Sequence, residues 1–197
     1  MKKLLALLTV TAFIIGGAER AAAATYVLDK AHCNIGFSVK HMVISNVKGK
    51  FDEFEGSFDF DEAKKGINSA QAAIKTASVN TGDQKRDDHL RSPEFFDAEK
   101  FPEITFTLKN SRSLGGGKMQ VTGDLTIHGV TKAVTLTGEF LGTANDPWGN
   151  KRAGFTAEGE VIRADYGMVW NKLLDGGGLV VGDKVKLQLE IEGILKK

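Results

Sequence analysis

The chain has 197 residues, with 26 Lys and Arg against 25 Asp and Glu, so its formal net charge is +1. This length fits one domain with its own hydrophobic core, and a charge so close to zero gives no reason to expect binding to nucleic acid or to an anionic membrane surface. With only three prolines and no Ser- or Pro-rich run, the chain has no obvious linker, so we expect a single domain.

The first 24 residues have the three-part pattern of a cleaved secretory signal peptide. Lys2 and Lys3 give a basic start, residues 4–15 are apolar and uncharged, and small residues end in alanines 21–24. The apolar run is too short for a comfortable membrane span. We therefore expect a mature domain over residues 25–197, a periplasmic location and no stable membrane insertion. Loss of this segment lowers the basic residues to 23 and the acidic residues to 24, so the mature charge is −1.

Apolar and polar residues alternate with a period of two through most of the mature chain, which predicts half-buried strands. In the first strand, expected over 31–41, Cys33 shares the apolar face with Phe37 and Val39. It is the chain's single cysteine, so no internal disulfide can form, and on this face it is expected to be buried as a small hydrophobe. Further strands are expected at 47–51, 54–60, 70–79, 104–109, 119–127, 134–140, 155–161 and 185–192.

Turn sequences separate these segments, and two short stretches favour helix. The turns are Gly115-Gly116-Gly117, His128-Gly129, Asn145-Asp146-Pro147 and Gly176-Gly177-Gly178. About eight strands with short connections are typical of an antiparallel up-and-down barrel or a sandwich. Short helical segments are expected near 83–97, where Asp83 and then Ser92 before Pro93 provide helix starts, and near 164–170. Such pieces would serve as lids at a barrel mouth.

Glycines inside the predicted strands bear on what the interior holds. Strand glycine often marks a bend or a place where another group packs closely, and the positions are Gly36, Gly49, Gly56, Gly123, Gly138 and Gly159. An eight-stranded barrel is either filled by its own side chains or holds one small ligand. The pattern alone therefore leaves an apolar tunnel and a solid core as equal alternatives.

Signals for catalysis are weak. The four histidines, His32, His41, His89 and His128, have no metal-like spacing. The strand phase of Cys33 argues against an exposed, activated thiolate. No Gly-x-Ser-x-Gly elbow or Walker motif is present. The sequence therefore predicts no catalytic residue, no metal site and no cofactor.

Residues 85–91 form the densest group of charged side chains. One interpretation is a solvated helix face with internal charge pairs, and the other is a site for the polar head of a ligand. Under the second interpretation, Arg86, His89 and Arg91 are the groups that would lie near the head.

Several blocks of the chain resemble a known family. They are His32–His41 (HCNIGFSVKH), Val47–Phe51 (VKGKF), His89–Asp97 (HLRSPEFFD), Phe101–Phe106 (FPEITF) and Gly123–Lys132 (GDLTIHGVTK). In their order and spacing they resemble the YceI-like, or polyisoprenoid-binding, family. This resemblance implies an exported, lipocalin-like antiparallel barrel, often dimeric, whose long apolar cavity binds polyprenyl phosphates, quinones or other long-chain lipids. It therefore favours the tunnel over the solid core.

The main hypothesis is a protein that sequesters or carries a long-chain isoprenoid and catalyses no reaction. Burial of the tail would gain roughly 25 cal/mol per square ångström of apolar surface. The expected tail contacts lie on the apolar faces of the predicted strands: Ile35, Phe37, Val39, Ile74, Phe106, Leu108, Leu136, Phe140, Phe155 and Val161. Two alternatives stay open. One is an envelope interaction or stress-response protein without bound lipid, and the other is an enzyme that acts on a small apolar substrate through the His89 region or Cys33.

Overall fold

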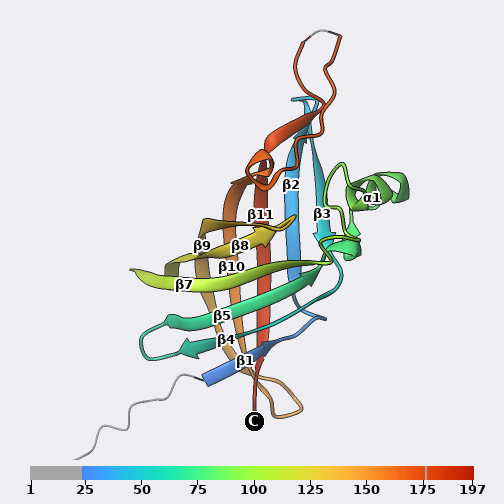
Figure 1. Ribbon diagram of the computed structural model, residues 1–197. Helices are drawn as coiled ribbons and strands as arrows, with labels where there is room; N and C mark the ends of the chain where they lie inside the picture. Colours follow the sequence, from blue (N-terminus) through green and yellow to red (C-terminus); the bar gives the residue numbers. More distant parts are fainter. Residues whose placement is uncertain (1–23, 176) are drawn as a thin grey trace, which may run out of the picture.

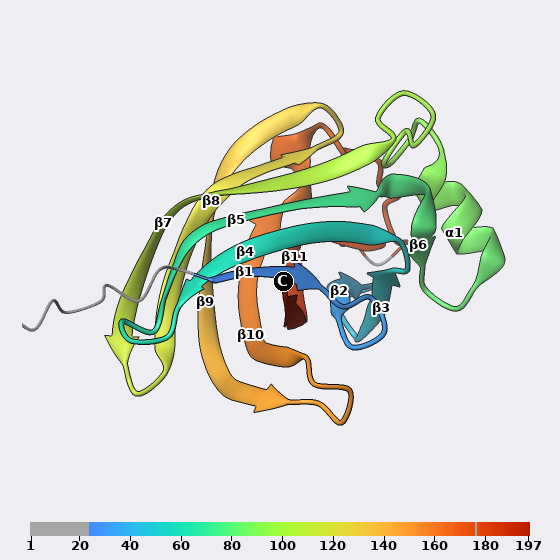
Figure 2. The same ribbon diagram turned by 90° about the horizontal axis from the view of Figure 1, so that it is seen from below.

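The computed structural model describes residues 24–175 and 177–197, so the predicted signal peptide lies outside the described residues except for Ala24. Eleven strands form one antiparallel sheet, and the pairing of β1 with β11 closes eight of them into a barrel (Figures 1 and 2). The ring consists of β1 (Ala24–Leu28), β4 (Phe54–Asp61), β5 (Gly66–Lys75), β7 (Glu103–Gly115), β8 (Lys118–Ile127), β9 (Val130–Asn145), β10 (Lys151–Ile162) and β11 (Val181–Leu195). The predicted all-β, eight-stranded antiparallel barrel is confirmed.

Strand β11 pairs with two different strands along the same edge. Its last residues pair with β1, whereas its N-terminal part pairs with β2 (Asn34–His41). From β2 the sheet continues through β3 (Ser45–Phe51) to β6 (Val79–Asn80). The sheet therefore forks at β11, and the three extra strands lengthen one side of the barrel (Figure 1).

Most predicted strands differ from the observed ones only in their bounds, as in β2, which begins at Asn34, and β9, which covers Val130–Asn145. Two strands differ in more than their bounds. The strand expected over 70–79 begins earlier, as β5, and is broken by a 3₁₀ turn at Thr76–Ser78 before β6. At this break the amide of Thr76 donates to the carbonyl of Pro102, 3.0 Å away, and the chain leaves β5 to join β3. Strand β1 was not predicted, because five residues directly after the signal-like segment are too few to show a clear alternation.

The helical segments are shorter than predicted. Helix α1 (Gln84–Arg91) begins at Asp83, whose carboxylate accepts a hydrogen bond from the amide of Arg86 at 3.0 Å. After Ser92 the chain forms hydrogen-bonded turns rather than a second helix. The later segment is a single 3₁₀ helix, Arg163–Tyr166, which ends at Gly167 with a φ of 79°. In residues 24–175 and 177–197, no helix is both long and apolar enough to span a membrane.

Aromatic rings fill the end of the barrel near the C terminus. The ring centroids of Phe60 and Phe140 lie 4.7 Å apart, and those of Phe58 and Phe155 lie 5.3 Å apart. Tyr26 stacks on Phe58 and is fully buried. This end of the barrel is therefore packed with the protein's own side chains.

Two of the strand glycines make room for aromatic rings that face the barrel interior. A Cβ atom on Gly123 would lie 2.5 Å from ring carbons of Phe106, and one on Gly49 would collide with the ring of Phe37. Each glycine lies on the strand next to the aromatic residue, so the missing side chain lets the ring lie across the sheet. Close packing at these glycines, as the sequence predicts, is confirmed.

Candidate functional site: an apolar cavity in the barrel

The barrel interior contains a cavity of about 270 Å³. Its lining comes from both the closed ring and the β2–β3 extension and is almost entirely hydrocarbon. The polar side chains of the lining are Ser57, Gln71, Thr156 and Arg163. Pockets for small ligands usually measure roughly 300–1,000 Å³, so this cavity lies just below that range. The interior is therefore packed at one end and hollow beyond it, which decides between the two alternatives left open by the strand pattern.

The predicted tail contacts line this cavity, with the exceptions of Leu108 and Phe140. Both exceptions are partly buried against the core. Phe140 packs on Phe60 in the aromatic end, and the register of β7 shifts directly after Leu108. The alternation identifies the inward face correctly but does not separate cavity lining from core packing. Contact of any of these residues with a lipid stays a prediction.

One part of the cavity wall is not β-sheet. Leu90 from α1, Phe95 from the following turns and Met168 from the segment after the second 3₁₀ helix all line the cavity. The His89 ring packs edge-on against the rings of Phe95 and Trp170, with both centroid distances at 4.9 Å. Within the described residues, side-chain packing rather than backbone hydrogen bonding joins these two segments. The wall can therefore separate here without breaking a strand pair.

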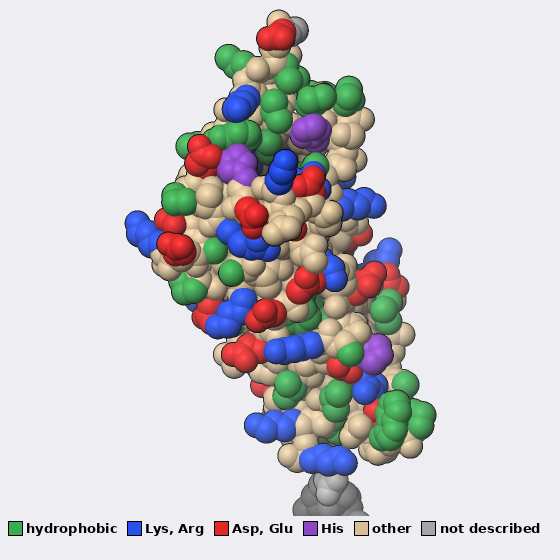
Figure 3. All heavy atoms as spheres, turned by 90° about the vertical axis from the view of Figure 1, so that its right-hand side faces the viewer, with side chains coloured by type: hydrophobic (Ala, Val, Ile, Leu, Met, Phe, Trp, Pro, Cys, Tyr) green, Lys and Arg blue, Asp and Glu red, His purple; other side chains and the backbone are tan. Residues whose placement is uncertain are grey.

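The two arginines predicted to lie near a headgroup do not line the cavity. Arg86 donates through Nε to the hydroxyl of Thr81 at 2.7 Å, and Arg91 donates to the backbone carbonyls of Ala77 and Val79 at 2.7 and 2.9 Å. These bonds fasten α1 to the chain before it. The face of the molecule that carries α1 displays charges of both signs (Figure 3). The geometry matches the solvated-helix interpretation, and a role at a headgroup stays a prediction for Arg86, His89 and Arg91.

Arg163 is a cavity-lining cation that the sequence analysis missed. Its side chain is 5% exposed. It donates through Nε to the carbonyl of Gly182 (3.0 Å), through Nη1 to the carbonyls of Met168 and Trp170 (2.7 and 2.8 Å), and through Nη2 to the carboxylate of Asp183 (3.1 Å). Because a guanidinium has five N–H groups, one on Nη2 has no acceptor within the described residues. The sequence could have indicated this position, because the alternation that turns Phe155 and Val161 inward also turns residue 163 inward.

Cys33 is half-buried rather than fully buried. Its thiol donates to the carbonyl of Glu192 and accepts from the amide of the same residue, both at 3.2 Å. Burial raises the pKa of this thiol, which disfavours the reactive thiolate. Cys33 does not line the cavity, so its contacts are structural.

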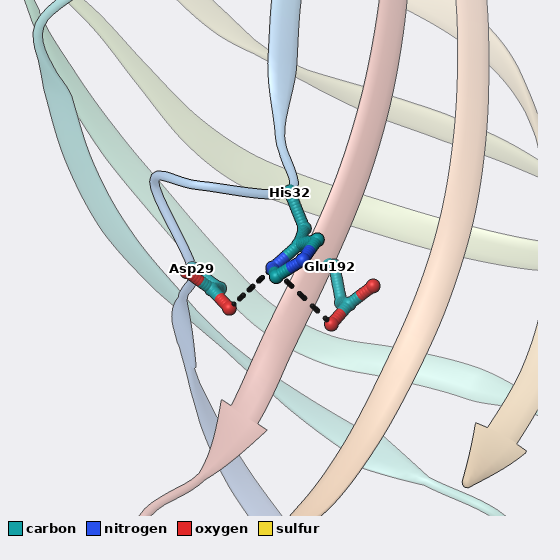
Figure 4. A group of neighbouring side chains, drawn as sticks. All are labelled: Asp29, His32 and Glu192. Atoms are coloured by element: carbon teal, nitrogen blue, oxygen red, sulfur yellow. Dashed lines mark hydrogen bonds and ion pairs between the residues drawn. The ribbon is translucent and has the colours of Figure 1, made fainter. Parts of the chain in front are cut away.

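A second polar group lies at the fork of the sheet. Ligand-type atoms of Asp29, His32 and Glu192 lie within 4.8 Å of one another (Figure 4). Oδ2 of Asp29 and Oε1 of Glu192, the two carboxylate oxygens nearest the His32 ring, each lie 2.5 Å from Nη1 of Arg152. Hydrogen bonds from Arg152 and then from His32 lower the pKa of Asp29 to about 2. The guanidinium therefore already provides the positive charge that a metal ion would bring.

A closed eight-stranded barrel with an apolar interior places the protein among the small closed β-barrels, the class to which lipocalins belong. The chain itself belongs to the YceI-like domain family, whose sequence model matches residues 26–193. The resemblance of its sequence blocks to this family is confirmed.

Comparisons with individual proteins agree. The UPF0312 protein VPA0850 of Vibrio parahaemolyticus serotype O3:K6 is 41% identical over 180 residues, which cover 89% of this chain and 90% of that protein. The crystal structure of BcnA from Burkholderia cenocepacia superposes with a TM-score of 0.73 at 26% identity, covering 84% of this chain and 98% of that one. A polyisoprenoid binding domain from Saccharophagus degradans has the same fold, with a TM-score of 0.62 at 19% identity over 88% of this chain and 99% of that chain.

Proposed function

We propose that the protein binds a lipid, holding the long apolar chain of an isoprenoid such as a polyprenyl phosphate or a quinone inside its barrel. The observation that carries the proposal is the hollow, almost purely hydrocarbon interior of a barrel whose other end is packed solid. Membership of the YceI-like family supports it, as does the fold shared with the polyisoprenoid binding domain of Saccharophagus degradans.

The physical basis of binding is burial of the chain. At roughly 25 cal/mol per square ångström, a tail that buries ~200 Å² gains about 5 kcal/mol. The 270 Å³ cavity has room for about nine heavy atoms at ~30 Å³ each, the share of one water molecule in the liquid. A longer tail must widen the cavity or continue past Phe95 and Met168, where the wall is not sheet.

For the polar head, Arg163 is the cation closest to the bound chain. Its remaining Nη2 hydrogen can be donated to a phosphate oxygen or a quinone carbonyl, and hydrogen bonds from a charged donor are the stronger kind. A head that emerges through the non-sheet wall would instead meet α1, which carries Arg86, His89 and Arg91.

Binding without catalysis is part of the proposal. Among the described residues that line the cavity, Arg163 is the one ionisable side chain. A guanidinium does not exchange its proton near neutral pH, so it is poorly suited to acid–base catalysis. We further propose, from the pattern of residues 1–24, that the protein is exported and carries or sequesters its lipid in the periplasm. A homodimer stays a prediction.

The test is to purify the exported protein, extract it with organic solvent and identify the extract by mass spectrometry. We expect a long-chain lipid that depends on the cavity, so that Ala157→Phe, which fills the cavity from its wall, yields protein without lipid. Phe60→Leu is the matched control, because Phe60 packs in the aromatic end, does not line the cavity and is not a predicted tail contact. Wild-type protein that contains no lipid and takes up neither a quinone nor a polyprenyl probe would contradict the proposal.

A further inference from the structure

Five large apolar side chains are exposed together at one end of the molecule. They are Met42, Val43 and Ile44 in the β2–β3 turn, and Leu173 and Leu179 in the loop before β11. We call these five residues the apolar tip. The amide of Met42 donates to the carbonyl of Val180 at 2.9 Å, and Leu173 bridges to Leu179, so the two segments form one surface. Figure 3 shows hydrophobic side chains gathered at this end.

The β2–β3 turn breaks the local rules for a hairpin turn. Met42 and Val43 have φ values of 49° and 64°, and the amide of Ile44 bonds to the carbonyl of His41. A turn with two positive φ values favours Asn-Gly, and a β-branched residue there is strained. Yet Val43 is 72% exposed and Ile44 81% exposed, so neither side chain gains burial in return. Strain without local compensation points to a function for these side chains.

The apolar tip directly continues the cavity wall. Val39 and Val181 line the cavity, and Val181 pairs with His41, the residue before the β2–β3 turn. Arg163 donates to the carbonyl of Gly182, which ties the cavity cation to the same part of β11. A lipid that passes between the cavity and this end of the barrel therefore arrives beside the tip.

The flanking groups match a phospholipid surface. Lys40 and Lys172 are exposed, and neither forms an ion pair with a described residue. Among the described residues of the two tip segments, 40–45 and 172–180, Asp175 is the one acidic residue. The Nζ of Lys172 lies 5.9 Å from the ring centre of Trp170. Apolar side chains bordered by lysine and tryptophan are typical of segments that enter the headgroup region of a bilayer.

From these observations we infer that the apolar tip inserts into a phospholipid bilayer and loads or unloads the lipid ligand there. The inference rests on the lipid-binding function proposed above. A second copy of the chain fits less well, because a stable dimer uses about 20–30 residues from each partner, whereas the tip offers five at a narrow end (Figure 1). The inserted tip would shorten the path of the lipid's apolar chain through water. It should therefore change the rate of lipid transfer between bilayer and cavity, and leave the affinity of the cavity for the lipid unchanged.

The experiment measures flotation of the protein with vesicles of phosphatidylcholine, alone or mixed with phosphatidylglycerol. The variant Val43→Asn with Ile44→Asp removes the apolar side chains, and Asn accepts positive φ more readily than Val. We expect its vesicle binding to fall roughly tenfold, since polar groups replace side chains that would enter the bilayer, while its thermal stability stays the same or rises. Leu141→Asp is the matched control, since Leu141 is exposed in β9, the strand that leads to the loop near the C terminus (Figure 1).

Transfer and affinity are measured separately in the same proteins. Uptake of a quinone from detergent solution should be equal in wild type and the tip variant, whereas uptake from vesicles should be slower in the tip variant. The inference is overturned if the wild type binds neither vesicle, if the tip variant binds as well as Leu141→Asp, or if the substitutions break a dimer without affecting vesicles. If the wild type takes up no quinone from detergent solution, the proposed lipid binding itself is refuted instead.

Discussion

The Sγ atom of Cys33 lies 3.2 Å from both the amide nitrogen and the carbonyl oxygen of Glu192. Glu192 lies where β11 changes partner, after its last pair with β2 at Glu190 and before its first pair with β1 at Gly193. On the edge that faces β2 and β1, the backbone of Glu192 therefore has no strand partner, although Gly154 of β10 lies opposite it on the other edge. The thiol fills that role together with the amide of Asp29. The side chain of Cys33 joins the two branches of the fork.

Removal of this thiol should destabilise the fold. Cys33→Ala leaves the amide of Glu192 without a partner, while its carbonyl keeps the amide of Asp29. We expect this loss to lower the free energy of unfolding by about 1–2 kcal/mol. Cys33→Ser keeps a group that can donate and accept, so it should lose less. Urea denaturation measures both, and a Cys33→Ala protein as stable as the wild type would refute this role.

The Asp29–Arg152 contact should make stability depend on acid pH. The hydrogen bond from Arg152 is the first cause that lowers the pKa of Asp29 from 3.8 to about 2. A carboxyl group with a lowered folded pKa stabilises the fold above its unfolded pKa, and this contribution is lost as the pH falls through the folded pKa. The difference in unfolding free energy between wild type and Asp29→Asn should therefore shrink from pH 4 to pH 2. Parallel curves for the two proteins would disprove the coupling.

Arg163 should be essential for the wall formed by the chain around the second 3₁₀ helix. Arg163→Met leaves the carbonyls of Met168, Trp170 and Gly182 without their charged donor. Hydrogen bonds to charged groups contribute about 1.5–3 kcal/mol each, so we expect a loss of at least about 3 kcal/mol in the free energy of unfolding. Arg163→Lys should restore part of it. Chemical denaturation tests this, and a loss below about 1 kcal/mol would show that the bonds matter little.

Phe95 should control how fast a bound lipid leaves. Its ring lines the cavity at the part of the wall that is held by side-chain packing with His89 and Trp170. Phe95→Ala should speed the release of a fluorescent polyprenyl probe, by roughly tenfold if about 1.4 kcal/mol of the barrier is lost. Phe101→Ala is the control, because Phe101 packs on His128 and does not line the cavity. Equal release rates in the two variants would place the exit elsewhere.

Much of the fold could be predicted because its strands have one apolar face. The alternation through Phe155, Ala157 and Val161 identified the inward side of β10, and the His128-Gly129 turn appears with positive φ at both residues. The fork of β11 could not be predicted, because apolar and polar residues alternate in the same way whichever strand β11 pairs with. The hollow interior also depends on how the rings pack, which explains why Phe155 lines the cavity and Phe140 does not.

The most direct test of the central claim uses the fluorescence of Trp170. The chain has two tryptophans, and Trp148 is 78% exposed in the loop after β9, so Trp148→Phe leaves Trp170 as the single reporter beside Phe95 and the cavity. Titration with a short-chain quinone should quench this fluorescence to saturation at one quinone per chain, and Ala157→Phe in the same background should abolish the quenching. Quenching that never saturates, or that is unchanged by Ala157→Phe, would contradict a lipid site inside the barrel.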